Sequence, residues 1–276
     1  ILDSIFYLLK KNKNTVSVLR LNGTITASPK SLNIVTMAKP IEQAFRQKGA
    51  REVVLDINCP GGSPVQTSLI YKRIRLLAEE KKIKVSSFTQ DVAASGGYWL
   101  ACAGDKIYVD KNSIIGSIGV ISGGFGFQEL IKKVGVERRL HTSGESKSFL
   151  DPFLSEKEED VDRLKNLQNQ IHENFKSIVR HRRNSKLVGE ESYLFTGEFW
   201  TGSKAIELGL VDELGDVYSV MRKKYGEKVK FKVFGHEQSW IRRRLGLKTS
   251  NDSLDNFIDN SIDSIYSRSI WSRYGL

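Results

Sequence analysis

Cysteine, histidine and proline are all scarce in this chain of 276 residues, which has two cysteines, four histidines and five prolines. Cys59 and Cys102 show neither the paired spacing of a metal site nor the pattern of a disulfide framework. Two isolated thiols fit small buried side chains or a reducing compartment. We expect no cofactor, because the sequence contains neither a metal-ligand cluster nor a phosphate-binding loop.

Long apolar runs are missing as well, since no stretch approaches the roughly 18 residues of a membrane span. Residues 1–13 combine an apolar stretch with Lys10, Lys11 and Lys13. We expect them to form an amphipathic N-terminal segment that packs on the body or on a neighbouring subunit. The alternative is peripheral contact with a membrane surface.

Positive charge is in excess, with 43 Lys and Arg against 32 Asp and Glu, a formal net charge of +11 and a pI near 9.5. This balance favours acidic partners, among them anionic lipid. The basic residues are spread along the chain, and the clusters at 181–183 and 242–244 are short. No aromatic and basic recognition motif accompanies them, so nucleic-acid binding is not expected.

Apolar strands and amphipathic helices alternate along residues 14–235. Segment 52–57 is a nearly continuous apolar run, typical of a strand that is covered on both faces. Helical periodicity fills 66–82, and another strand is predicted at 83–89. Further strands are predicted at 16–21, 106–109, 136–142 and 229–234, and helices at 41–47, 94–103, 128–134, 155–183 and 201–208. The pattern predicts one α/β domain over 14–235 with a mainly parallel sheet, followed by a polar tail, 236–276.

Ser95 lies in the segment Asp91–Tyr98, where a strand ends, small residues follow and a helix begins. A hydroxyl at a helix N-terminus faces free amides, which favour developing negative charge. A serine there can also serve as a simple helix cap, so the segment alone does not decide between a nucleophile and a cap. Gly61 and Gly62 follow another apolar strand. Their amides could hold an oxyanion, or the pair could form a tight turn.

A serine nucleophile requires a base. None of the four histidines stands in the context of a Ser/His/Asp triad, although His141 is near a predicted strand end. A lysine can replace histidine where burial keeps its amine neutral. Lys147 follows the predicted strand 136–142 among small residues, and Phe149, Leu150 and Phe153 could exclude water from it. For a single lysine, a solvated loop charge remains the alternative.

The order of motifs NCPGG, AASGGY, GSIGV and SGESK over residues 16–234 resembles the signal peptide peptidase A family of Ser/Lys peptidases. That resemblance implies a ClpP/crotonase-like spiral of β-β-α units. It also implies that Ser95 is the nucleophile, Lys147 the general base, and Ser117 the residue that orients the lysine. Gly62 would donate one oxyanion hydrogen bond, and the Ser95 or Gly96 amide the other.

The resemblance further implies a serine endopeptidase that degrades remnant signal peptides or unstructured apolar protein segments as a ring-like homo-oligomer. Cys59 stands where the family usually has serine, which we interpret as an isosteric change. The motifs are similar to shorter, anchor-free bacterial versions of the family. A cytoplasmic protein, or one peripherally associated with the bacterial inner membrane, is therefore expected. A catalytically silent scaffold and a crotonase-type acyl-CoA enzyme remain the alternatives.

Overall fold

The computed structural model describes residues 14–144, 146–235, 265 and 267–275. The predicted N-terminal segment, residues 1–13, and residues 236–264 of the predicted tail lie outside this part. The strands are β1 (Thr15–Asn22), β2 (Ala50–Cys59), β3 (Lys84–Ala94), β4 (Lys106–Val109), β5 (Ile114–Gly116), β6 (Phe199–Thr201), β7 (Glu213–Leu214) and β8 (Lys230–Phe234). The helices are α2 (Ile34–Arg46), α3 (Pro64–Lys81), α4 (Gly96–Ala101), α5 (Gln128–Lys133), α6 (Glu158–Arg183), α7 (Glu191–Leu194), α8 (Gly202–Glu207) and α9 (Val217–Tyr225), with short 3-10 turns at Asn184–Lys186 and Ser272–Tyr274.

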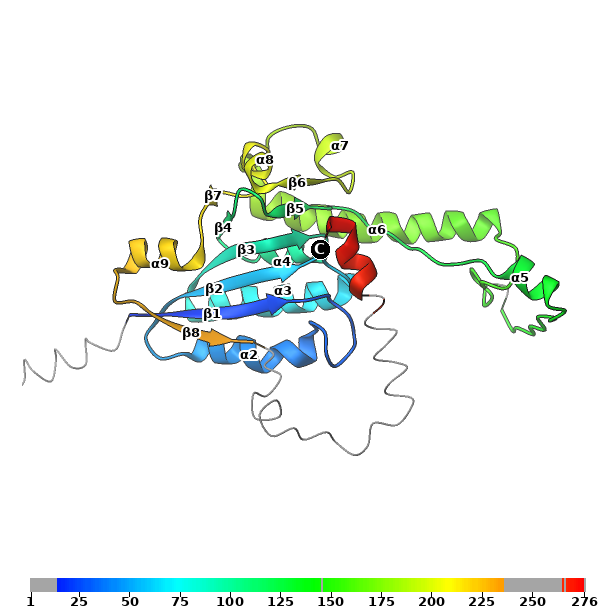
Figure 1. Ribbon diagram of the computed structural model, residues 1–276, viewed down its shortest axis with the longest axis horizontal. Coiled ribbons are helices and arrows are strands. Elements are labelled where there is room, and N and C mark those ends of the chain that lie inside the picture. Colours follow the sequence, from blue (N-terminus) through cyan, green and yellow to red (C-terminus); the bar gives the residue numbers. More distant parts are fainter. Residues whose placement is uncertain (1–13, 145, 236–264, 266, 276) are drawn as a thin grey trace, which may run out of the picture.

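The strands form one sheet in the order β6-β5-β3-β2-β1-β8, with β4 paired to β3 and β7 (Figure 1). Every pairing is parallel except that of β5 with β6. β3 pairs with β4 through its first half and with β5 through its second half, so the sheet divides where β3 approaches Ser95. The α/β class and the mainly parallel sheet predicted from the sequence are confirmed.

Two apolar clusters cover the faces of the sheet. The larger one joins the strands to α2, α3 and α4, and it extends to Phe175 and Val179 of α6. The smaller one joins the opposite face to Met221 of α9. At about 25 cal/mol per Å² of buried apolar surface, these two clusters supply the main stabilisation of the fold. Because Phe175 and Val179 belong to the larger cluster, α6 packs against α4, the helix that follows Ser95, as a further layer.

Residues 120–157, which we call the arm, leave the sheet after β5 and return at the start of α6. In Figure 1, α5 and the turns around it lie beyond the far end of α6, away from the strands. The arm holds itself together through Phe127, whose ring lies 5.6 Å from that of Phe153 and whose amide donates to Pro152 O. Most of its large apolar side chains are exposed nonetheless: Ile121, Phe125, Leu130, Val134 and Val136. So many large apolar side chains exposed on one segment are unusual for a protein surface.

Three sequence predictions were wrong in detail. The helix predicted at 41–47 begins earlier, at Ile34, because Asn33 caps it, and Pro40 therefore lies inside α2. The helix predicted at 155–183 begins three residues later, at Glu158, with Lys157 as its cap. Residues 136–142 form no strand; they belong to the arm. In each case the local pattern was compatible with a neighbouring register or state that tertiary contacts selected.

Candidate functional site

Ser95 stands between β3 and α4 with φ 53° and ψ −122°. Such a backbone costs a non-glycine residue about 1–3 kcal/mol, and it is found where surrounding structure enforces it. The enforcing contact here is the Ser95 amide, which donates to Gly116 O of β5 at 2.8 Å. The side chain makes no capping hydrogen bond and is partly exposed. The hydroxyl is therefore held at a helix start without serving as its cap.

Gly61 and Gly62 lie directly against this serine. A Cβ placed on Gly61 would be 2.8 Å from Ser95 Cβ and 2.9 Å from Gly96 N. Gly62 is closed in from its other side, because a Cβ there would lie 2.0 Å from Ile25 O. The two glycine-rich strand ends, remote in the sequence, thus meet at one point. Only glycine fits at either position, because both also have positive φ angles.

Two amides at this point are free to bind an anion. Gly96 is the first residue of α4, where no earlier helical carbonyl can accept its N–H. Neither Gly62 N–H nor Gly96 N–H donates to another described residue. The Ser95 amide, which the sequence left open as a donor, is already bonded to Gly116 O. Gly62 and Gly96 are therefore the pair that could hold an oxyanion.

Ser117 follows β5 beside the nucleophile. It has φ 52°, and its amide donates to Glu198 O at 2.6 Å. Since Gly116, the residue before it, accepts from the Ser95 amide, Ser117 lies one residue from the site. The structure thus brings together Ser95, Gly62, Gly96 and Ser117. All four were singled out from the sequence.

α6 supports this arrangement along its length. His172 Nε2 lies 2.9 Å from Ile118 O, in the loop that begins at Ser117. Phe175 stacks on Trp99 of α4, with ring centroids 5.0 Å apart. One helix therefore contacts both the Ser117 loop and the helix that starts after Ser95.

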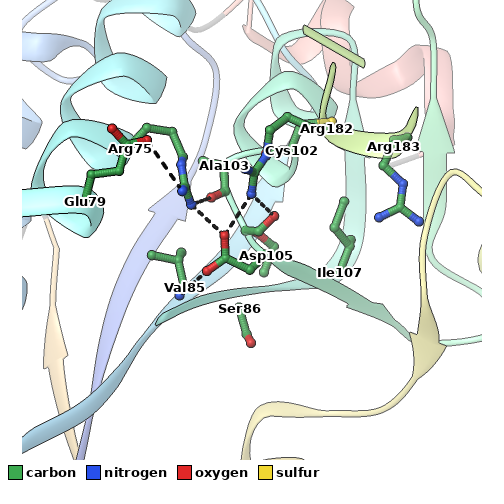
Figure 2. Close-up of polar contacts among 12 residues, drawn as sticks. Arg75, Glu79, Val85, Ser86, Cys102, Ala103, Asp105, Ile107, Arg182 and Arg183 are labelled. Atoms are coloured by element: carbon green, nitrogen blue, oxygen red, sulfur yellow. Dashed lines mark hydrogen bonds and ion pairs between the residues drawn. The ribbon is translucent and has the colours of Figure 1, made fainter. Parts of the chain in front are cut away.

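The C-terminal end of α4 is fixed by two arginines that converge on Asp105, as Figure 2 shows. Arg182 of α6 donates to Cys102 O and Gly104 O, both at 2.8 Å, and Arg75 of α3 donates to Ala103 O at 3.0 Å. Guanidinium groups at this position bind the unpaired carbonyls and complement the negative end of the helix. Burial opposes ionisation of Asp105, but the Val85 amide and Arg182 lower its pKa overall.

Sequence reasoning missed His172, Arg182 and Arg75 as supports of the site. Arg182 belongs to the short basic cluster at 181–183, which the sequence analysis assigned to no contact, and nothing in the sequence pointed to His172 or Arg75. In the structure Arg182 contacts α4, and Arg183 is 2% exposed and paired with Asp212. A charge run on a helix does not by itself reveal which of its members turn inward.

Lys147 lies apart from this group, in a turn of the arm where its amide donates to Gly144 O. Its side chain is exposed, and its ammonium has no ion pair or hydrogen bond with any residue the structure describes. The aromatic residues expected to cover it are engaged elsewhere. Phe149 lies under Arg163 of α6, and Phe153 packs within the arm.

The position of the Lys147 turn can be gauged along α6. Phe149 contacts α6 at Arg163, whereas the site contacts it at His172. Nine helical residues separate these two positions, or about 13 Å along the axis. No hydrogen bond joins Lys147 to Ser95 among the described residues. The two residues are therefore not brought together within one copy of the chain.

Neither cysteine is a candidate nucleophile, because both are fully buried. Burial raises the pKa of Cys59 to about 12 and that of Cys102 to about 11. Thiols in this state are inert at neutral pH. Among the described residues, no group of His, Cys, Asp and Glu is arranged to hold a metal ion.

A cavity of about 770 Å³ opens on the α9 face of the sheet, with Val18, Phe88, Val109 and Val217 in its lining. Ser95, Gly62 and Lys147 do not line it. This cavity is thus separate from the free amides and the hydroxyl. None of the helices among the described residues is long and apolar enough to cross a membrane.

Comparison with known proteins gives a consistent family. Residues 77–230 match the sequence profile of Peptidase family S49. A putative signal peptide peptidase SppA of Enterococcus faecium is 31% identical over 66% of this chain and 52% of its own length. A probable protease SohB of Buchnera aphidicola is 31% identical over 80% of this chain and 63% of its own length.

A more similar relative carries a different name. The protein named Na(+)/H(+) antiporter NhaA in Brucella melitensis is 47% identical over 95% of this chain, but the match spans 37% of that protein. A Brucella abortus protein of the same name matches to the same extent. The chain thus corresponds to little more than a third of these two relatives. Because the S49 profile covers more than half of this chain, including the segment from α4 through the arm to α9, the chain belongs to peptidase family S49.

Proposed function

We propose that this chain is a serine endopeptidase in which Ser95 is the nucleophile and Lys147 of a second copy is the general base. The observation that carries the proposal is the state of Ser95. Its backbone is strained, its hydroxyl does not cap α4, and two free amides lie beside it. A structural cap would hydrogen-bond to its helix, and this hydroxyl does not. Membership of peptidase family S49 supports the same reaction class.

The chemistry follows from these positions. Neutral Lys147 Nζ accepts the Ser95 Oγ proton as the oxygen attacks a peptide carbonyl carbon. The Gly62 and Gly96 amides bind the oxyanion of the tetrahedral intermediate. Lys147 then gives the proton to the leaving amine, and an acyl ester remains on Ser95. Water, deprotonated by the same lysine, hydrolyses the ester and releases Ser95. Ser117 lies where it could orient the incoming lysine.

A second copy is required because the arm carries its lysine away from its own serine. Docking of the exposed apolar arm on a neighbour would bury that surface and place Lys147 in a drier environment. Burial is what a lysine base needs in order to be neutral. Head-to-tail contacts generate a ring where the rotation between neighbours closes, and a ring is the homo-oligomer that we propose.

Suitable substrates are extended protein segments, because free backbone amides between two strand ends recognise a peptide backbone rather than a folded surface. The relative from Enterococcus faecium is named as a putative signal peptide peptidase. We therefore propose remnant signal peptides or unstructured apolar segments as the substrate class.

Mixing two inactive variants tests the shared dyad. Ser95→Ala and Lys147→Met should each lower casein hydrolysis by several orders of magnitude, because the two residues act as a unit. Co-assembled in equal amounts, they should recover about a quarter of parental activity, since one interface in four joins an intact serine to an intact lysine. Recovery near zero in confirmed mixed assemblies would place the dyad within one chain, and parental activity in Lys147→Met would end the assignment.

A fluorophosphonate probe separates the alternatives. A peptidase should be labelled at Ser95, and the label should be absent from Ser95→Ala. A silent scaffold or a crotonase-type enzyme has no need of an activated serine there. Some Ser/Lys enzymes resist such probes. The deciding measurement is therefore the rate of peptide hydrolysis by the parent compared with that of Ser95→Ala.

A further inference from the structure

Positive charge gathers at the edge of the sheet opposite Ser95. Thr15 of β1 is in register with Ala50 of β2 and with Lys230 of β8, and Glu52 of β2 is in register with Lys84 of β3. Four neighbouring parallel strands therefore start at one edge, which we call the amino-terminal edge. The helices and turns that lead into these strands end at the same place (Figure 1).

Six lysines on this edge are exposed and unpaired. Each has no ion-pair or hydrogen-bond partner for its ammonium group among the residues that the structure describes. They are Lys48, Lys81, Lys82, Lys84, Lys228 and Lys230. The strands that they flank, from β8 to β3, span about 14 Å at the usual strand spacing. That width is less than two Debye lengths at physiological salt, so their fields add.

Carboxylates on the same edge do not offset this charge. Glu52 is buried and bound by Lys224, and Glu213 pairs with Lys106. Glu79 and Glu227 lie near Arg75 and Arg222, at 3.7 and 4.0 Å. Glu80 is the remaining exposed acid of α3 close to the lysines. The edge therefore keeps a clear positive excess.

Helix stabilisation explains only part of this pattern. A lysine in the last turn of a helix complements the helix dipole, as Lys81 does in α3. Lys84 and Lys230 are in strands, however, and Lys228 is in the turn before β8. None of these three lysines is in the last turn of a helix. Folding gives no reason for unpaired charge at these positions, and their mutual repulsion costs stability.

We infer that the amino-terminal edge is a docking surface for a membrane rich in anionic lipid. A row of ammonium groups without directional hydrogen bonds suits a diffuse negative surface, whereas specific phosphate recognition favours the arginine fork. Tyr225, the last residue of α9 and three residues before Lys228, is covered by Arg51 and bound through its hydroxyl to Glu52, so its ring is not free to stack on a base.

The start of the described chain lies on this same edge. Asn14 donates to Tyr225 O at 2.8 Å and accepts from the Lys230 amide at 2.9 Å. The residues that precede Asn14 are therefore joined to the body at the basic edge, and their sequence contains both large apolar residues and lysines. That composition matches interfacial segments of peripheral proteins.

This orientation separates the site from the lipid. Lys84 and Ala94 are the two ends of β3, which has 11 residues. Such a strand spans about 35 Å. Ser95 would thus stand well above the headgroups, and a substrate segment would have to leave the bilayer to reach it.

Vesicle co-sedimentation of the full chain tests the surface. At about 50 mM salt the parent should bind phosphatidylcholine vesicles that contain about one-third phosphatidylglycerol. At about 500 mM salt it should dissociate from them, because salt screens the attraction. Lys81→Gln/Lys82→Gln/Lys84→Gln should weaken this binding about 100-fold, at about fivefold per lysine. The control Lys111→Gln/Lys157→Gln/Lys165→Gln removes the same charge from exposed positions away from the edge, and it should bind within about threefold of the parent.

Equal binding by the parent and the edge variant, or equal losses in both triple variants, would overturn the proposal. Binding to nucleic acid, the other class of polyanion, is measured by fluorescence anisotropy with duplex DNA and single-stranded RNA. If the edge lysines mattered for nucleic acid and not for the anionic vesicles, the surface would be a nucleic-acid site and the inference would be wrong.

Discussion

Gly61 and Ser95 are packed so closely that a single methyl group on Gly61 would lie 2.8 Å from Ser95 Cβ. This contact joins the end of β2 to the end of β3 and sets the distance between the hydroxyl and the Gly62 amide. The positive φ of Ser95 carries a conformational cost, and the Ser95 Cβ lies against the position that a Gly61 side chain would occupy. Strain and close packing at one serine are what a prearranged nucleophile requires.

Gly61→Ala should lower peptide hydrolysis by about 100-fold or more, because a displacement near 1 Å disrupts the reacting geometry. The matched control is Gly226→Ala, whose φ of +89° is also positive but whose Cβ would meet nothing within 4 Å. The control should lose about 1–3 kcal/mol of unfolding free energy and keep its activity. Equal kinetics in the two variants would show that contact with Ser95 is unimportant.

Replacing Phe125 and Leu130 of the arm by serine should yield a folded but monomeric and inactive protein. Their side chains are 80% and 56% exposed, so the fold does not depend on them. Analytical ultracentrifugation would give the mass, and casein hydrolysis the activity. Val35→Ser is the control, since Val35 is 85% exposed on α2. A double variant that assembles and cleaves like the parent would argue against an arm-mediated site.

Asp212→Asn should destabilise the protein by about 2–4 kcal/mol, because Arg183 would be left buried with its charge uncompensated. Arg183 and the Asp212 side chain are 2% and 10% exposed. Urea unfolding measures the change. The control Glu207→Gln should lower the unfolding free energy by less than about 1 kcal/mol, since its partner Lys204 is 47% exposed.

The pair of Arg183 and Asp212 should also make the stability of the protein fall at acid pH. Burial raises the pKa of Asp212, but hydrogen bonds from Arg183 and Lys186 lower it to about 2 overall. A carboxyl whose pKa is depressed by folding stabilises the protein above its unfolded value near 3.9. That contribution should disappear as the pH falls from about 4 toward 2. The parent should lose stability over this range more steeply than Asp212→Asn does.

The buried thiols should resist alkylation by iodoacetamide at pH 8 in the folded protein and react fully in urea. Burial raises the pKa values of Cys59 and Cys102 to about 12 and about 11. A raised thiol pKa stabilises the fold below the unfolded value near 8.5 and loses that effect as the pH rises above it. Mass spectrometry would count the modified cysteines. Rapid labelling of either thiol in folded protein would contradict its burial.

Local pattern was sufficient for most strands and for the serine. A nearly continuous apolar run identified β2, because both faces of this strand are covered. Small residues after β3 indicated Ser95, and adjacent glycines indicated the turn at Gly61. Pattern failed in the arm, where residues 136–142 look like a strand but have no neighbouring strand to pair with. It also failed to assign His172 and Arg182 their contacts, because these depend on how α6 lies on α4.

The sequence by itself determined the class of fold, the residues able to carry the chemistry and the excess of positive charge, because these follow from residue type and spacing. Tertiary structure decided that two distant glycine-rich turns meet at Ser95, that Gly96 rather than Ser95 keeps a free amide, and that Lys147 lies on an arm away from its own serine. It also decided that unpaired lysines gather at one edge of the sheet. These are relations between residues far apart in the chain, and only the packing of strands and helices sets such distances.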